Sequence, residues 1–193
     1  MILLLFILAA CTDKGSQSNT ITVADLSDRE DVILSTITDQ AFVFDFNVDS
    51  EYEEVTVKME KYEFGQLVEQ SRNELTAMVE ETGSIVFSAS KTSDESNEKN
   101  FYIGVGGKRG SVSNMKADKE MVDVKNMSSV WGNFSESKTF EEGKEIVLAS
   151  IGYSSSESGV SSFNNDFYDN MEAHMDELEE FDIALVLKAE FAK

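Results

Sequence analysis

Apolar and polar residues alternate along much of the chain, which is the pattern of strands with one buried face. The clearest run places Phe42, Phe44, Phe46 and Val48 on one side and mostly polar residues on the other. Aromatic and branched side chains also favour strands. By the same pattern we expect further strands at 21–23, 55–60, from 67 onward, 84–106 as a long hairpin, 130–134, 146–153 and 183–191.

Two segments depart from simple alternation of apolar and polar residues. The segment 107–127 has no clear period, and we expect a loop there with a short strand near Met121–Val124. In the last strand, Val186 falls on the outer side together with Lys188 and Glu190. An apolar residue on the outer side indicates a strand that is central in its sheet and covered on both faces.

Helical patterns occur in two places. Ser27 and Glu30 have the spacing of a capping box, which predicts a short helix over about 28–38. Near the C-terminus, an apolar stripe and an opposing acidic face predict an amphipathic helix over about 166–180. The apolar stripe consists of Phe167, Met171, Met175 and Leu178, and the acidic face of Asp169, Glu172, Asp176, Glu179 and Glu180.

The order of these elements predicts the fold class. The strands do not alternate with helices, as they would in a parallel βαβ fold. We therefore expect a mainly β protein, either an antiparallel β-sandwich or an open barrel, with the two helices at its edges. The chain contains no proline, so no strand lacks a backbone donor for that reason.

The net charge of the chain excludes some classes of binding partner. Acidic residues outnumber basic ones by 37 to 16, and the net charge is −21. Such a charge repels nucleic acid and anionic lipid headgroups, so we expect no nucleic-acid partner. The charge itself is compatible with simple solubility or, alternatively, with attraction of cations or of a basic partner.

The N-terminal residues have features of a targeting segment. Residues 1–10 are uncharged and mostly apolar, and they end in small residues just before the cysteine. A spanning helix needs about 20 apolar residues, whereas a signal-peptide core needs about 7–15. We expect a signal peptide at 1–10, a flexible polar tether at 11–19 and one acidic domain at 20–193. A buried N-terminal strand with a free core cysteine is the alternative.

The sequence Leu8-Ala9-Ala10-Cys11 resembles the lipobox of bacterial lipoproteins. In that family the peptide is cut before the cysteine, and its thiol carries a diacylglycerol. The resemblance implies that Cys11 is the lipid attachment site and that fatty acyl chains hold the domain at the membrane, outside the cytoplasm. The domain's further partner would then be an unknown envelope protein or ligand. No Lys or Arg precedes Cys11, which departs from the basic start of such signal peptides.

In layout, the whole chain also resembles small uncharacterised lipoproteins of Gram-positive bacteria, and this resemblance implies no activity. Cys11 is the only cysteine, so its acylation leaves no thiol for a disulfide or a thiolate metal site. No residue pattern predicts a cofactor.

A glycine-rich segment, 104–110, is the one stretch that suggests phosphate binding. It lacks a glycine or a hydroxyl residue where the phosphate-binding motifs require one, so a flexible hairpin end is the favoured interpretation. The segment nevertheless begins the only locally basic stretch of the chain. Candidate contacts for an anionic ligand or acidic partner are Lys108, Arg109, Lys116 and Lys119.

The acidic face of the second helix suggests a cation. Like charges four residues apart repel one another, and a divalent ion would relieve that repulsion. The candidate ligands for Ca²⁺ are Asp169, Glu172, Asp176 and Glu180. Calcium prefers six to eight oxygens that converge from a loop, so a solvated helix face is the favoured interpretation.

Two functions from different classes remain. The first is a non-catalytic binding or regulatory module that uses loops at one end of the fold, at 91–100, 106–119 and 154–165. The alternative is an extracytoplasmic hydrolase that uses carboxylates or a Ser/Lys pair. His174 is the only histidine, and its place beside the apolar stripe favours a residue at the edge of the core. No residue is assigned a catalytic role.

Overall fold

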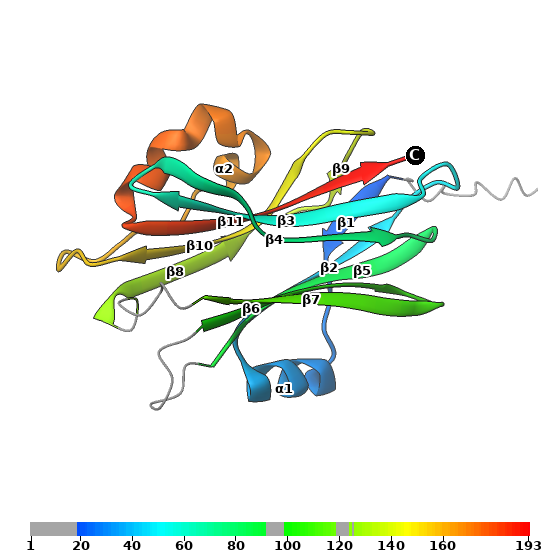
Figure 1. Ribbon diagram of the computed structural model, residues 1–193, viewed down its shortest axis with the longest axis horizontal. Coiled ribbons are helices and arrows are strands. Elements are labelled where there is room, and N and C mark those ends of the chain that lie inside the picture. Colours follow the sequence, from blue (N-terminus) through cyan, green and yellow to red (C-terminus); the bar gives the residue numbers. More distant parts are fainter. Residues whose placement is uncertain (1–18, 92–98, 119–123, 125) are drawn as a thin grey trace, which may run out of the picture.

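Two antiparallel sheets lie face to face in the computed structural model, which describes residues 19–91, 99–118, 124 and 126–193 (Figure 1). Six strands of the described residues form one sheet and five form the other. The sheets do not close into a barrel, so the fold is the β-sandwich of the two predicted alternatives.

Strand order follows the hydrogen bonding in each sheet. The six-stranded sheet runs β7 (Gly110–Asp118), β6 (Lys99–Gly107), β5 (Thr82–Ser90), β2 (Thr38–Asn47), β1 (Thr20–Val23) and β9 (Lys138–Thr139). The five-stranded sheet runs β4 (Gln66–Met78), β3 (Glu54–Glu63), β11 (Ile183–Ala192), β10 (Ile146–Ser154) and β8 (Ser128–Asn133). The predicted hairpin over 84–106 is confirmed, because β5 pairs with β6.

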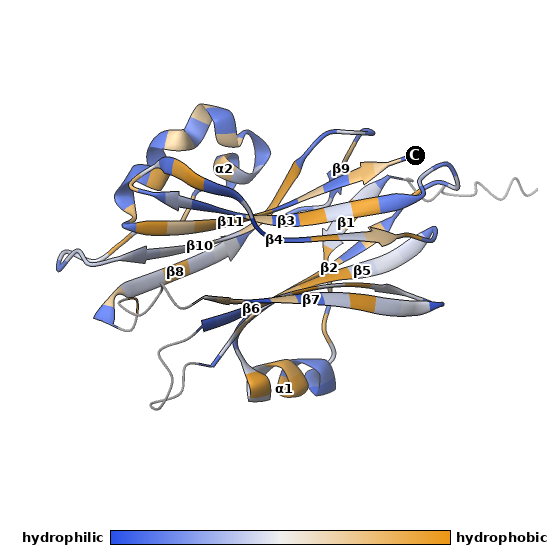
Figure 2. Cartoon of the chain, viewed as in Figure 1, coloured by the Kyte–Doolittle hydropathy of each residue, from blue (hydrophilic) through white to orange (hydrophobic). Residues whose placement is uncertain are grey.

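The core fills the space between the sheets and is rich in phenylalanine. Alternation places the inward residues of each strand in it, as the sequence predicts for Phe42, Phe44 and Phe46. The rings pack against one another across the two layers; Phe44, for example, stacks on Phe134 with centroids 5.3 Å apart. Figure 2 shows how apolar and polar residues alternate along these strands.

Helix α1 (Asp28–Ile37) forms where the capping box predicts it. The Ser27 hydroxyl accepts the Glu30 backbone N–H, and the Glu30 carboxylate accepts the Ser27 backbone N–H at 2.9 Å. None of its residues is buried, and the helix projects from the sandwich (Figure 1). Local capping therefore accounts for this helix better than packing does.

The predicted second helix is broken. The structure has a short α2 (Asn165–Asp169) followed by a 3₁₀ segment, η2 (Met171–Glu180), with a kink at His174. Asn164 and Asn170 occupy the two cap positions, and asparagine favours caps over helix interiors. The predicted helical segment over about 166–180 is therefore present with its apolar stripe facing the protein, but it is divided at Asn170 and kinked at His174.

The segment from α2 to η2 covers the outer face of the five-stranded sheet. Phe181, just after η2, packs directly on Gly152 of β10, where a Cβ would clash with its ring. Val186 of β11 is fully buried, and β11 is the middle strand of its sheet. The prediction that the last strand is central and covered on both faces is confirmed.

The loop expected over 107–127 begins instead as an edge strand. β7 pairs with β6 along its whole length from Gly110 to Asp118. Its side chains are largely exposed and polar, so the hydrophobic period that marks a buried strand is missing. Of the short strand expected near 121–124, residues 121–123 lie outside the described part, and Val124 lies in a turn whose carbonyl accepts the Met127 N–H.

Candidate functional site

Four charged side chains form a closed ring on the outer face of the five-stranded sheet. Lys188 Nζ lies 2.9 Å from Glu60 and 3.1 Å from Glu145, and Lys58 Nζ lies 3.3 Å from Glu60 and also contacts Glu145. The Tyr62 hydroxyl donates to Glu60 at 2.7 Å. Charges therefore alternate around the ring, and its four members sum to zero.

Strand register creates this ring. Lys58 of β3 lies directly opposite Lys188 of β11, and like charges in that position repel. Glu60, two residues further along β3, shares their face and reaches both amines. Glu145, just before β10, closes the ring from the other side. The two carboxylates therefore hold a pairing that the lysines alone would oppose.

The ring favours the charged forms of Glu145 and Lys58. Burial opposes ionisation of Glu145 most strongly, yet the hydrogen bonds and charges of Lys58 and Lys188 together hold its pKa below the ordinary value. Burial also opposes the charge on Lys58, and Glu145 and Glu60 outweigh it, so the pKa of Lys58 is raised. Burial, then the hydrogen bond to Glu60, raises the pKa of the Tyr62 hydroxyl, which stays a donor at neutral pH.

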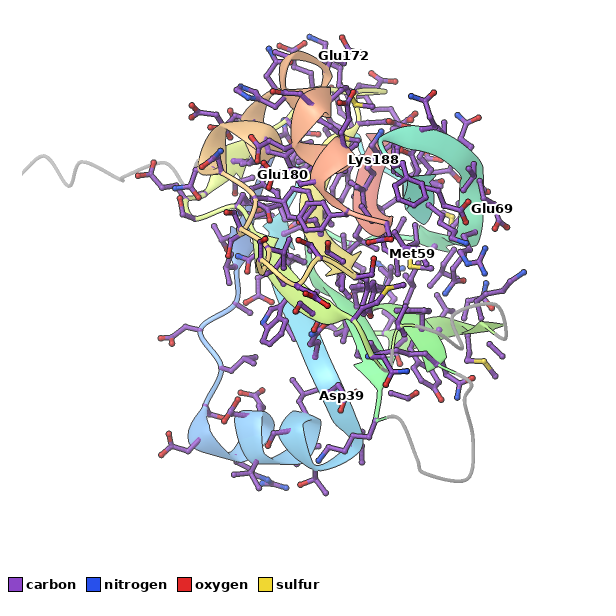
Figure 3. All side chains as sticks on the ribbon, turned by 90° about the vertical axis from the view of Figure 1, so that its left-hand side faces the viewer. Asp39, Met59, Glu69, Glu172, Glu180 and Lys188 are labelled. Atoms are coloured by element: carbon purple, nitrogen blue, oxygen red, sulfur yellow. The ribbon has the colours of Figure 1, made fainter. Side chains whose placement is uncertain are left out.

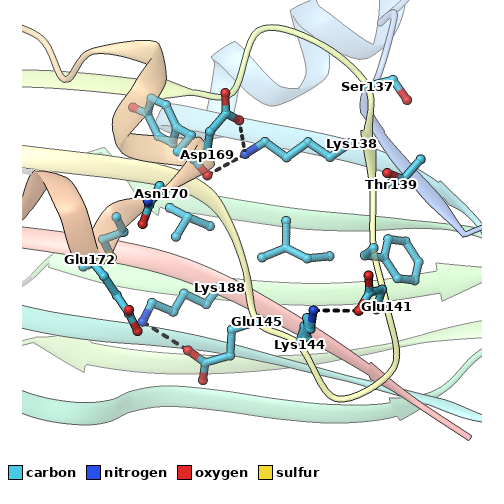
Figure 4. A pocket seen from close by; sticks show the side chains of 15 residues that line it. Ser137, Lys138, Thr139, Glu141, Lys144, Glu145, Asp169, Asn170, Glu172 and Lys188 are labelled. Carbon is cyan, nitrogen blue, oxygen red and sulfur yellow. Dashed lines mark hydrogen bonds and ion pairs between the residues drawn. The ribbon is translucent and has the colours of Figure 1, made fainter.

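A basin of about 610 Å³ lies beside the ring, between η2, the segment 137–147 and β11. Figure 4 shows Lys188 and Glu145 at one side of it and two further ion pairs around its rim. Lys138 contacts Asp169 at 2.8 Å, and Lys144 contacts Glu141 at 2.6 Å. The basin therefore offers a ligand both ammonium and carboxylate groups.

The pKa shifts in and beside the basin move those groups away from neutral pH. A general acid or base works best with a pKa near the operating pH. Within the basin, the pKa of Glu145 is lowered and burial raises the pKa of Tyr168 to about 12, and beside it the pKa of Lys58 is raised. In the described part of the chain, no serine hydroxyl is hydrogen-bonded to a lysine, so no observation there favours the Ser/Lys hydrolase.

The basic residues singled out from the sequence do not form one cluster. Lys108 and Arg109 occupy the turn between β6 and β7, and Arg109 contacts Glu80. Lys116 lies near the other end of β7, about 24 Å away at 3.4 Å per residue, and Lys119 lies outside the described residues. The first residues of β6 lie at the opposite end of that strand from this turn, so residues 106–110 lie apart from Lys99 and Asn100 of the expected 91–100 surface, of which 92–98 lie outside the described residues.

The acidic residues proposed for Ca²⁺ are also spread apart. Asp169 ends α2 and pairs with Lys138, whereas Glu172, Asp176 and Glu180 follow along η2. Figure 3 places Glu172 and Glu180 at different ends of that segment, which is kinked between them at His174. Across the described residues, no group of three or more His, Cys, Asp and Glu could hold a metal ion.

Cys11 lies outside the described residues, so the structure places no lipid attachment site. In the part of the chain that is described, no helix is both long and apolar enough to cross a bilayer. His174 lies at the kink in η2, with Nδ1 3.6 Å from Glu177. This position agrees with a histidine at the edge of the core.

Lowering the pH should reduce the stability that the ring contributes, because it protonates Glu145. Because its pKa is lowered in the folded state, its stabilising contribution is present above the ordinary value of 4.5 and is lost as pH falls through the folded pKa. We expect the stability difference between the wild type and Glu145→Gln to be largest near pH 7 and to shrink toward about pH 3. Urea unfolding over this range measures it.

The control for this prediction is Glu157→Gln, at an exposed loop position. Its difference from the wild type should be small at every pH, since exposed charges contribute little. A Glu145→Gln difference that stays constant from neutral to acidic pH contradicts the role given to the ring.

The fold and site together define a two-layer antiparallel β-sandwich with a charged basin on one outer face. The chain belongs to the YgaN domain family, whose model matches residues 20–191. This match begins at β1 and ends within β11, so it spans every strand of both sheets. No curated protein and no solved structure shows a significant match.

Proposed function

We propose that this chain is a lipoprotein held at the outer face of the cell membrane, where its sandwich serves as a non-catalytic binding module. The lipobox-like sequence ending at Cys11 carries the proposal. Both the family match and β1 begin at Thr20, which leaves residues 1–19 free to act as leader and tether. Cleavage before Cys11 would leave nine residues, 11–19, ahead of the domain.

The physics of anchoring supports this arrangement. Each buried CH₂ contributes about 0.8 kcal/mol, and two acyl chains anchor stably where one is marginal. Eight residues between the anchor and Thr20 reach at most about 28 Å when extended. The net charge of −21 repels an anionic surface, so the domain would stand away from the headgroups.

The charged basin supports the binding role. Two ring members, Glu145 and Lys188, line the basin beside the rim pairs, so the basin presents both donors and acceptors. A ligand with both acidic and basic groups would match that pattern better than a singly charged one. The ligand's pairing with the rim lysines and carboxylates would replace contacts that are partly exposed to solvent.

Replacing Cys11 tests the anchor. We expect the wild-type chain in the membrane fraction of its host and accessible to protease added to intact cells. Cys11→Ala should leave the membrane fraction almost completely, because no other acyl attachment site exists in the sequence. Ser16→Ala, in the same polar segment, is the matched control and should fractionate like the wild type. Cys11→Ala that remains fully membrane-bound would refute the proposal.

A further inference from the structure

The two sheets each leave one strand edge open on the same side of the sandwich. β7 ends the six-stranded sheet and β4 ends the five-stranded sheet. Two asparagines tie β4 to the other sheet: Asn114 of β7 donates from Nδ2 to the Glu74 carbonyl at 2.9 Å, and Asn73 of β4 donates from Nδ2 to the Phe101 carbonyl of β6 at 3.2 Å. The strands are joined there by side chains and not by backbone pairing.

Beyond these asparagines the edges enclose a groove of about 470 Å³. Its floor is apolar, with Phe46, Ala77 and Val105 nearly buried. Its walls carry Met78 of β4, which is 75% exposed, and Val112 of β7, which is 49% exposed. Large apolar side chains at this exposure mark a surface suited to covering by another chain.

The parts of the two edges that border the groove lack the usual protection against strand addition, since Lys116 of β7 and the register shifts of β4 lie beyond the asparagines. Natural proteins blunt open edges with bulges, prolines or lysines. Beside the groove, the pairing of β3 with β4 is regular from Glu54↔Met78 to Met59↔Asn73, and the register shifts lie further along. The pairing of β6 with β7 has no shift, and the chain has no proline.

Backbone groups of β4 point into the open edge. The Glu74 carbonyl accepts from Asn114, so Glu74 faces away from β3, whereas the Val79 N–H donates to Glu53 and faces toward it. Neighbouring residues in an antiparallel strand alternate in this respect. Thr76 and Met78 therefore present their N–H and C=O groups to the groove.

The carboxylate of Glu80 lies at one end of the groove. One oxygen of Glu80 contacts the Arg109 guanidinium, while Oε2 is buried and has no hydrogen-bond partner in the described part of the chain. The Arg109 side chain is 89% exposed, so its pairing is easily exchanged for another. A buried carboxylate oxygen without a partner favours a cationic group from outside.

We propose that this groove accepts an extended segment of a partner protein as an added strand. The segment would place apolar side chains on the floor at alternate positions and a lysine or arginine at Glu80. Residues 76–78 of β4 would pair with about 10 Å of the added strand, through the backbone groups of Thr76 and Met78. This interaction does not depend on lipid anchoring or on the charged basin.

The test uses a short fluorescein-labelled peptide of alternating valine and lysine, titrated with the full chain. We expect saturable binding, and protection of β4 amides from hydrogen exchange. Thr76→Pro removes an edge N–H that β3 does not use, and edge strands tolerate proline there. Thr76→Pro should weaken binding of the peptide about tenfold, because it removes one backbone hydrogen bond and displaces the added strand. Thr76→Ala keeps the N–H and should bind within about twofold of wild type.

Glu80→Gln provides a second variant that leaves the edge intact. It should weaken the valine–lysine peptide several-fold and leave an uncharged valine–threonine peptide unchanged. A peptide with proline at its centre should not bind, because it cannot complete the strand pairing. Absence of binding by the wild type, equal binding by the proline peptide, or full affinity in both Thr76→Pro and Glu80→Gln would overturn the proposal.

Discussion

Replacing Phe191 with alanine is expected to lower the free energy of unfolding by about 4 kcal/mol. Phe191 of β11 is fully buried and lies at the centre of an aromatic cluster. Its ring stacks on Phe140 with centroids 4.3 Å apart and meets the edges of Phe46 at 5.4 Å and Tyr52 at 6.4 Å. Removing the ring forfeits its burial and leaves a cavity that three rigid rings cannot readily fill.

The same substitution at Phe64 is the matched control. Phe64 lies in the turn between β3 and β4 and is 65% exposed. Phe64→Ala should change stability by less than about 0.5 kcal/mol. Denaturant unfolding of both variants measures the contrast. Equal and small effects at the two positions would contradict the packing described for the core.

Glu60→Gln is expected to destabilise the fold by about 3 kcal/mol. The Glu60 side chain is 3% exposed and accepts from Lys58, Lys188 and Tyr62. Neutralising it leaves two lysines, which lie opposite each other, with only one carboxylate between them. Breaking a buried ion pair by removing one partner costs far more than an exposed pair contributes.

Two further variants test whether the destabilisation by Glu60→Gln comes from the ring. Glu141→Gln breaks an exposed ion pair with Lys144 and should leave stability unchanged. Adding Lys188→Met to Glu60→Gln removes one cation with one anion, so the double variant should be more stable than the sum of the single changes predicts. Additive losses in the double variant would show that the ring is not a coupled unit.

Local signals in the sequence predicted local structure well. Ser27 and Glu30 are sufficient to start α1, because the capping box acts within one turn. Period-two alternation located the central strands, since each has a face that the core requires to be apolar. Even the burial of both faces of β11 was visible in Val186. These elements depend on neighbouring residues only.

Elements whose form depends on distant partners were predicted less well. β7 is an edge strand with little buried area, so nothing obliges its sequence to alternate. Asn170 favours helix caps and so indicated the break between α2 and η2. The amphipathic stripe, however, indicated one continuous helix. Packing of Phe181 on Gly152, far apart in the chain, determines how that segment lies on the sheet.

The candidate site could be predicted only in part. Alternation placed Lys58, Glu60 and Lys188 on outer strand faces, as the structure confirms. That Lys58 and Lys188 are directly opposed depends on the register of strands more than a hundred residues apart in sequence. Glu145 precedes β10 without any pattern of its own. Only the three-dimensional structure joins the four residues into a ring.

The most direct test of the lipid-anchored account is the intact mass of the chain purified from membranes of its native host. The account predicts a product that begins at Cys11 and carries the added mass of a diacylglycerol group on that residue. A product that retains residues 1–10 and has an unmodified Cys11 thiol would contradict it.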